Sequence, residues 1–395
     1  MSEPARPAGA KHLLWALIVG QVGMHSTMAG LRMAAPLQAL REGHSVWMVG
    51  LLLSLFAAAP VLSALYAGRL ADRWGYHRPV HLSVALTMVG AVLAVLSTWV
   101  QGPGHFVLLC LAAMLTGTGT NTGMLAIQRT AGVLAKDGTE RVRVFSWLGV
   151  APAFANVVGP VAAGFAIDAG GFGAAYGLLL ALPLATLIAA RKVPRQPLAE
   201  VHQRPPGHTA WGLLKSPGLK RLLVVNWLLS MCWDVHTFAV PVLGHEREFS
   251  ASTIGLILGT FTMAVTLVRL LIPLFAHRLN DLIVLRVAML TTAVLFGLYP
   301  LSPNAPLMAL CAAVLGVALG SVQPMVMSML HHLTPHQRHG EALALRSMLI
   351  NLSSTLMPLA FGAMGAAAGA AVLFWAVGAA VGGGSWLARG LRSAH

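Results

Sequence analysis

GRLADRWGYHR, residues 68–78, is a dense charged stretch in a chain of which only 10% of the residues are charged. It holds three arginines, one aspartate and two glycines. The flanking segments, 47–66 and 79–100, contain no Lys, Arg, Asp or Glu. Each has the length, about 20 residues, that a helix needs to cross the hydrocarbon core of a bilayer. The stretch is therefore predicted to be a short turn between two membrane helices.

The composition of the whole chain agrees with this prediction. Of its 395 residues, 57% are hydrophobic, and the mean hydropathy is +0.74. Soluble domains are nearer 45–50% apolar and about 25% charged. The net charge of +14 does not indicate nucleic-acid binding, because the basic residues recur in short loops and form no aromatic-interleaved surface. The class predicted is an integral, multi-pass protein of the bacterial inner membrane.

Twelve apolar segments are predicted to be membrane helices, and a polar linker divides them into two groups of six. The linker, residues 191–221, contains five prolines and seven Lys/Arg against one acid. The predicted domains are a six-helix bundle at 1–190, the cytoplasmic linker at 191–221 and a second bundle at 222–395. The segments are 12–35, 46–67, 80–100, 105–128, 143–167, 172–190, 222–243, 251–275, 283–300, 306–330, 341–365 and 369–388.

The distribution of Lys and Arg predicts that both termini are cytoplasmic. In that orientation only Arg32, Arg41 and Arg247 lie in or beside the outer half of the membrane, and the other 23 of the 26 basic residues lie at the cytoplasmic side.

The two halves also resemble each other. Arg69-Leu70-Ala71-Asp72 follows the second segment, and Arg278-Leu279-Asn280-Asp281 follows the eighth. A Pro-x-x-x-Gly string occurs at Pro160 in the fifth segment and again at Pro358 in the eleventh. The positions are equivalent in the two halves, which favours an internal duplication.

The charged stretch resembles motif A of the major facilitator superfamily, a Gly-x-Leu-Ala-Asp-Arg-x-Gly pattern between the second and third helices. The resemblance implies an all-α membrane fold of twelve transmembrane helices in two pseudo-symmetric six-helix bundles. It also implies that Asp72 accepts hydrogen bonds at the N-terminus of the eleventh helix, near Gly340, with Arg129 completing a cytoplasmic gate. The matching residues, with a basic residue just after, are Gly68, Leu70, Ala71, Asp72, Arg73, Gly75 and Arg78.

Two further strings bear on the direction of transport. Gly159, Pro160 and Gly164 resemble motif C, which is associated with antiporters, although Ala163 replaces one glycine. The fourth segment lacks the arginine of motif B and instead carries a Thr- and Asn-rich run around Asn121. The first string favours export, and the second departs from the usual proton-linked pattern of the family.

The seventh segment carries the main candidate for proton coupling. Asn226, Ser230 and Asp234 follow an i, i+4, i+8 course and so share one helical face. A carboxyl near mid-membrane is stabilised in its neutral form by burial, so Asp234 is expected to bind and release a proton. The alternative is a structural role, with Asp234 paired to a neighbour such as His236.

Polar residues in the first, fourth, seventh and tenth segments are predicted to line a substrate cavity, as the resemblance implies. Arg32 either binds an anionic group or extends to the outer interface, and both interpretations stay open. Arg269 and Arg346, nearer the cytoplasm, are expected to serve gating or anchoring. The cavity candidates are Gln21, His25, Arg32, Asn121, Asn226, Ser230, His236 and Gln323.

The function predicted is secondary active transport of a small organic molecule, most simply proton-coupled export by a monomer. Uptake of an organic anion, suggested by Arg32 and His25, and a membrane sensor without flux are the alternatives. The sequence contains no nucleophile elbow, zinc-protease or Walker string, so an enzyme or an ATP-driven pump is not expected. No cofactor and no metal site are predicted, and the proton is the expected coupling ion.

Overall fold

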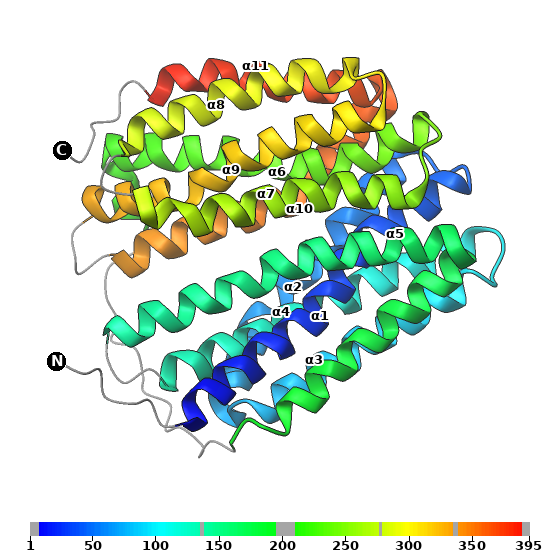
Figure 1. Cartoon of the computed structure of the whole chain (residues 1–395), viewed down its shortest axis with the longest axis horizontal. Helices are drawn as coiled ribbons and strands as arrows, with labels where there is room; N and C mark the ends of the chain where they lie inside the picture. Colours follow the sequence, from blue (N-terminus) through cyan, green and yellow to red (C-terminus); the bar gives the residue numbers. More distant parts are fainter. Residues whose placement is uncertain (1–7, 135–137, 195–209, 276–278, 335–338, 389–395) are drawn as a thin grey trace. The chain divides into compact units, whose positions relative to one another are not determined.

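The computed structural model of the chain describes residues 8–134, 138–194, 210–275, 279–334 and 339–388. Helices dominate this part of the chain, and no strand occurs in it (Figure 1). The elements are α1 (Ala8–Arg41), α2 (Val46–Trp74), α3 (His77–Ser97), α4 (Pro103–Leu134), α5 (Gly138–Ala190), η1 (Ala210–Lys215), α6 (Pro217–Glu246), α7 (Ala251–Phe275), α8 (Asp281–Leu298), η3 (Tyr299–Leu301), α9 (Ala305–Leu333), α10 (His339–Ala368) and α11 (Ala370–Ala388).

Every predicted apolar segment coincides with a helix, and most helices extend beyond it by several residues. The fifth and sixth segments both fall in α5, whose backbone leaves helical geometry at Gly170 and Gly171. Within the described residues, ten helices are long and apolar enough to cross a membrane, with α5 counted once. The all-helical membrane fold is therefore confirmed.

The prediction that residues 68–78 form a short turn is wrong in extent. α2 continues through this stretch to Trp74, and α3 begins at His77, so only Gly75 and Tyr76 make the turn. Arg69, Leu70 and Ala71 are good helix formers, and α2 continues without a break to Trp74. Gly75 has φ +64°, a conformation that other residues adopt only with strain, and its amide donates to the Ala71 carbonyl at 3.0 Å.

The chain divides into two compact units, residues 1–35 with 55–203 and residues 36–54 with 204–395. In the first unit, α3 packs on α4 and α5. α5 crosses α1 so closely that a Cβ at Gly159 would lie 2.4 Å from the Ser26 carbonyl oxygen. Thr27 Oγ1 donates to the Leu179 carbonyl at 2.9 Å, and Thr186 Oγ1 donates to the Gly20 carbonyl at 2.8 Å. The motif-C-like glycine thus lies where two helix backbones meet.

In the second unit, α7 packs on α9, α8 packs on α9 and α11, and α6 packs on α10 and α11 (Figure 1). Aromatic rings fill the space between α8, η3 and α11, where Phe374 contacts Phe296 and Tyr299. Just beyond the end of α6, the Arg247 guanidinium donates to the carbonyls of Pro300 and Ser302. These bonds tie the end of α6 to the connection between α8 and α9.

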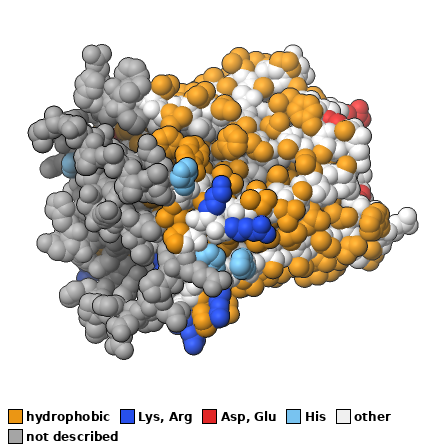
Figure 2. Space-filling view, turned by 60° about the horizontal axis from the view of Figure 1, so that its bottom comes forward, with side chains coloured by type: hydrophobic (Ala, Val, Ile, Leu, Met, Phe, Trp, Pro, Cys, Tyr) orange, Lys and Arg blue, Asp and Glu red, His pale blue; other side chains and the backbone are white. Residues whose placement is uncertain are grey.

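The surface is apolar over much of its area. Large hydrophobic side chains on α7, α8 and α9 are about half exposed, among them Leu270, Val287 and Leu310. On the face shown in Figure 2, hydrophobic side chains form a broad area, with Lys, Arg and His beside the grey atoms and acidic side chains at the opposite end. Such a distribution is typical of helices in contact with lipid.

Candidate substrate and proton sites

The polar face of α6 is built as the i, i+4, i+8 spacing predicts. Asn226 is 2% exposed and Asp234 is 8% exposed, while Ser230 between them is half-buried. Both buried side chains bond to α10 at matching positions: Arg346 Nε donates to Asn226 Oδ1 at 3.2 Å, and Ser354 Oγ donates to Asp234 Oδ1 at 3.5 Å. Each pair is separated by 120 residues. α6 and α10 therefore run in the same direction along a polar seam.

Asp234 stands apart from the other acids of the chain. It is the only acidic side chain among the buried residues that the structure describes. Its hydroxyl neighbour Ser354 donates at the outer limit of hydrogen-bond distance, which is a weak contact. A carboxyl that is removed from water is suited to exchange a proton.

His236, two residues further along, lies on a different face of α6. Its Nε2 is 3.0 Å from the Tyr299 hydroxyl, and its ring packs against Phe261 with centroids 4.3 Å apart. The side chain is fully buried in this aromatic environment. The partner that the structure gives His236 is therefore Tyr299.

In the first unit, the predicted cavity residues Gln21 and His25 lie on one face of α1. Gln21 Oε1 and His25 Nδ1 are buried and accept or donate no hydrogen bond within the described residues. The charge of Arg32 acts on His25 from two turns further along the helix. A face with unpaired polar atoms is expected where a ligand or water supplies the missing partner.

The other two cavity candidates are more accessible. Asn121, on α4, is half-buried, and Gln323, on α9, is exposed. Next to Asn121, Thr120 Oγ1 donates to the Met24 carbonyl at 3.5 Å and so connects α4 to α1. The assignment of Asn121 and Gln323 to a substrate cavity stays a prediction.

The residues of motif A are described only in part. The side chains of Gly68 and Asp72 lie outside the described residues, so the predicted contact of Asp72 with α10 stays a prediction. The Arg78 guanidinium stacks 3.5 Å from the centroid of the Trp74 ring, which fixes the turn. Tyr76 is 1% exposed, and burial raises the pKa of its phenol. Leu70 and Arg129 are half-buried, and Arg73 is exposed.

Sequence reasoning did not find the partners on α10. Arg346 was expected to serve gating or anchoring, and Ser354 was not singled out. Arg346 and Ser354 are eight residues apart, as are Asn226 and Asp234. This shared interval is the only indication of the pairing in the sequence. Hydroxyl and guanidinium side chains are too common for that interval alone to identify a pair.

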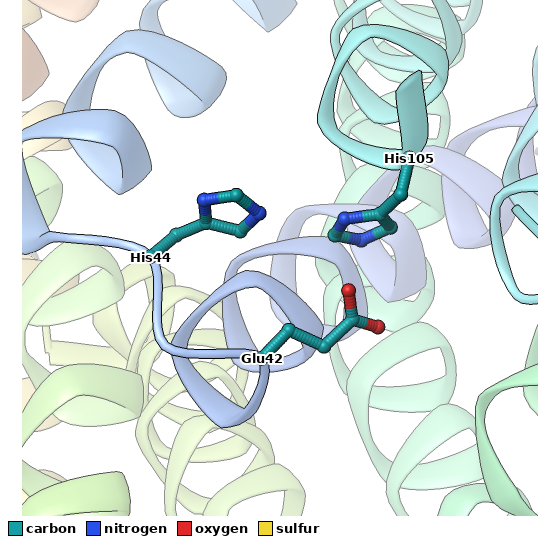
Figure 3. A group of neighbouring side chains, drawn as sticks. All are labelled: Glu42, His44 and His105. Carbon is teal, nitrogen blue, oxygen red and sulfur yellow. The ribbon is translucent and has the colours of Figure 1, made fainter. Parts of the chain in front are cut away.

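Figure 3 shows Glu42 and His44, at the turn between α1 and α2, and His105, in the first turn of α4. Each can offer one ligand atom to a metal ion. Glu42 also accepts a hydrogen bond from Gln38 Nε2 at 2.7 Å. Because Glu42 and His44 belong to the second unit and His105 to the first, no metal site is assigned to them.

Long apolar helices with buried polar side chains indicate a class, the multi-pass membrane proteins. The model of the Major Facilitator Superfamily matches residues 17–242 and 222–393, so the chain belongs to this superfamily. It is therefore a transport protein and not an enzyme, and a multi-pass protein of the inner membrane. It is 23% identical over 291 residues to the enterobactin exporter EntS of Salmonella choleraesuis (strain SC-B67), covering 72% of this chain and 69% of that protein. The exporter of Escherichia coli O81 (strain ED1a) is 24% identical with the same coverage.

The fold is also that of solved transporters. The nucleoside transporter NupG superposes with a TM-score of 0.73 at 16% identity, covering 95% of this chain and 98% of that chain. A bacterial homologue of the human lysosomal transporter Spinster, in an inward-facing and occupied conformation, gives 0.73 at 12% identity and covers 98% of each. At these identities the likeness shows the fold alone.

Proposed function

We propose that this protein is a proton-coupled exporter of a small organic molecule. Two six-helix halves, residues 1–190 and 222–395, joined by the linker 191–221, alternate access to a substrate site near mid-membrane. There are twelve spans in this proposal, since α1 counts as one and the two parts of α5 count separately. Both termini are cytoplasmic, because that orientation places 23 of 26 basic residues at the cytoplasmic side. The protein works as a monomer.

The observation that carries the proposal is the buried carboxyl of Asp234 on α6. It takes up a proton when the site is open to the side with the higher proton concentration and releases it when the site is open to the cytoplasm. The Ser354 hydroxyl donates a weak hydrogen bond to the carboxylate. The proton is the coupling ion, and no other cofactor is required.

Export is supported by the relatives, which are exporters of enterobactin in several enteric bacteria. The motif-C-like Gly159, at the close crossing of α5 and α1, also favours export. Enterobactin is therefore one compound to be tested, alongside a panel of other small organic molecules.

The test uses everted membrane vesicles, whose lumen is acidified by respiration. We expect a transported compound to accumulate in the lumen and to raise the lumenal pH, as a fluorescent acridine dye reports. Asp234→Asn should abolish both effects, and Asp168→Asn, at an exposed acid of α5, should leave them unchanged. Accumulation that persists after the gradient is collapsed would show that proton coupling is wrong.

Uptake of an organic anion is the second candidate, and Arg32 beside His25 on α1 is the observation that favours it. The same vesicles distinguish the two directions. An uptake system driven by proton symport would expel the compound from a preloaded acidic lumen, whereas the proposed exporter would retain it. A sensor would show no flux of any compound in either arrangement.

A further inference from the structure

A cluster of hydrogen-bond donors, two of which are buried without an acceptor among the described residues, lies in the second unit. It consists of Asn226 on α6, Arg269 on α7 and Arg346 on α10. The three residues lie nine, six and seven residues from Pro217, Phe275 and His339, the neighbouring ends of their helices. That is about 9–14 Å along each helix axis, well inside the ends. They therefore occupy a similar depth.

The contact between Arg346 and Asn226 fixes the orientation of the amide. A guanidinium can only donate, so Arg346 Nε donates to Asn226 Oδ1 at 3.2 Å, and the amide oxygen is used. The other end of the amide, Asn226 Nδ2, can only donate, and it is buried without a partner among the described residues. The free donor of Asn226 thus calls for an acceptor.

Arg269 adds a second positive charge to the cluster. The helix that carries Arg269, α7, packs on α6, which carries Asn226, and the charge of Arg346 is felt at Arg269. Arg269 Nε is buried and has no hydrogen-bond partner within the part of the chain that the structure describes. Two cations held together inside a membrane protein are strongly unfavourable without an anion.

The acid on the same helix face is too far away to serve as that anion. Asp234 lies eight residues further along α6, which is about 12 Å of helix axis. Glu341 is the nearest acid to Arg346 in the sequence, and its side chain lies outside the described residues. The experiment below therefore includes Glu341.

We propose that Asn226, Arg269 and Arg346 form a binding site for an anionic group, a carboxylate or its equivalent, of the molecule that the protein exports. The proposal rests on the exporter function proposed above and narrows the substrate to an organic anion. A carboxylate has two oxygens and about four acceptor positions, which match the Asn226 amide and the two guanidinium groups. Arg346 keeps its bond to Asn226 and presents its remaining N–H groups.

The first experiment measures binding without transport. The full-length protein in nanodiscs of phosphatidylcholine is titrated with sodium benzoate, and its unfolding temperature is followed. Benzamide, which has the same shape and no charge, is the matched ligand. We expect benzoate to raise Tm in a saturable way and benzamide to leave it unchanged. A rise of equal size with both ligands, or no rise with benzoate, would overturn the proposal.

Variants then locate the site. Arg269→Gln and Arg346→Gln each remove a charge-assisted contact. In each variant the benzoate concentration that gives half of the maximal rise in Tm should increase about 10- to 100-fold. Arg286→Gln, at an arginine of α8 outside the cluster, should respond like the unaltered protein. Arg346→Lys keeps the charge and should retain a weakened response to benzoate. This variant therefore tests the site even if Arg346→Gln fails to fold. Glu341→Gln should keep the response. If the unaltered protein gave no response and Glu341→Gln gave one, the arginines would serve an internal ion pair with Glu341, and the proposal would be wrong.

An anionic lipid headgroup offers the same chemistry and is distinguished by a second arm. Nanodiscs containing phosphatidylglycerol are compared with the neutral ones. If phosphatidylglycerol raises Tm through Arg269 and Arg346 while benzoate does nothing, the site binds lipid and the proposal fails. Neither of these binding experiments requires transport. Benzoate binding can therefore be observed when proton-driven export in vesicles is absent, and export can be observed when benzoate does not bind.

Discussion

The two polar levels of the α6–α10 pair differ in the sign of their charge. At one level Asp234 accepts a weak hydrogen bond from Ser354, and eight residues nearer the helix starts Asn226 accepts one from Arg346. The first level carries a buried carboxyl group, whose charge can be removed by a proton. The second has two arginines and no described acid, so its charge is removed only by a bound anion. Proton and substrate would therefore bind at different atoms, and their exchange would be coupled through the conformational change rather than by direct competition.

The sharpest test of this difference is Asp234→Asn, for which we expect the largest effect. The variant cannot exchange a proton, so transport driven by a pH gradient should be abolished. The benzoate-induced rise in Tm should remain. Transport is measured in everted vesicles, and binding is measured on the purified protein. An Asp234→Asn protein that lost benzoate binding as well would show that the two levels are one site.

Much of this arrangement could be predicted from the sequence. The contacts that could not be predicted depend on how distant helices pack together. The face of α6 that carries Asn226, Ser230 and Asp234 is set by the period of the helix, and the spans are set by apolar length. The partners on α10 are 120 residues away, and their pairing depends on how two helices pack, which no local pattern specifies. His236 illustrates the same limit, since its partner Tyr299 is 63 residues away on another element. In motif A the spacing of glycine and aspartate predicted the family correctly, whereas the length of the turn depended on local helix propensity.

The second test concerns stability at the arginine level. Asn226→Leu removes the acceptor of Arg346 and leaves that guanidinium without its described partner. We expect the free energy of unfolding to fall by about 1.5–3 kcal/mol, the range for a hydrogen bond to a charged group. Asn351→Leu, at an exposed position of α10, is the matched control and should have little effect. Equal stability of Asn226→Leu and the unaltered protein, in reversible unfolding by denaturant, would contradict the importance of this contact.

His236 supplies a third region against which the two levels can be compared. Tyr299→Phe removes the hydroxyl 3.0 Å from His236 Nε2 and keeps the ring packing against Phe374. Hydrogen bonds between membrane helices contribute about 0.6 kcal/mol on average, so we expect a loss of that size in unfolding experiments. Transport should be unchanged, as should that of the control Tyr66→Phe, whose side chain is 65% exposed. A transport defect as large as that of Asp234→Asn would place His236 in the proton pathway.

The smallest effect is expected at Ser354. Its hydroxyl reaches Asp234 Oδ1 at 3.5 Å, so Ser354→Ala should change the free energy of unfolding by less than about 0.5 kcal/mol. The hydroxyl stabilises the carboxylate, and its loss favours the protonated carboxyl. The pH of half-maximal transport should therefore rise, by less than about one unit, while Ser354→Thr keeps the donor and the original pH dependence. The measurement is the initial rate of vesicle transport across a pH series. An unchanged midpoint in Ser354→Ala would mean that the Ser354 hydroxyl does not stabilise the carboxylate, and the contrast between the two levels would then rest on the arginines.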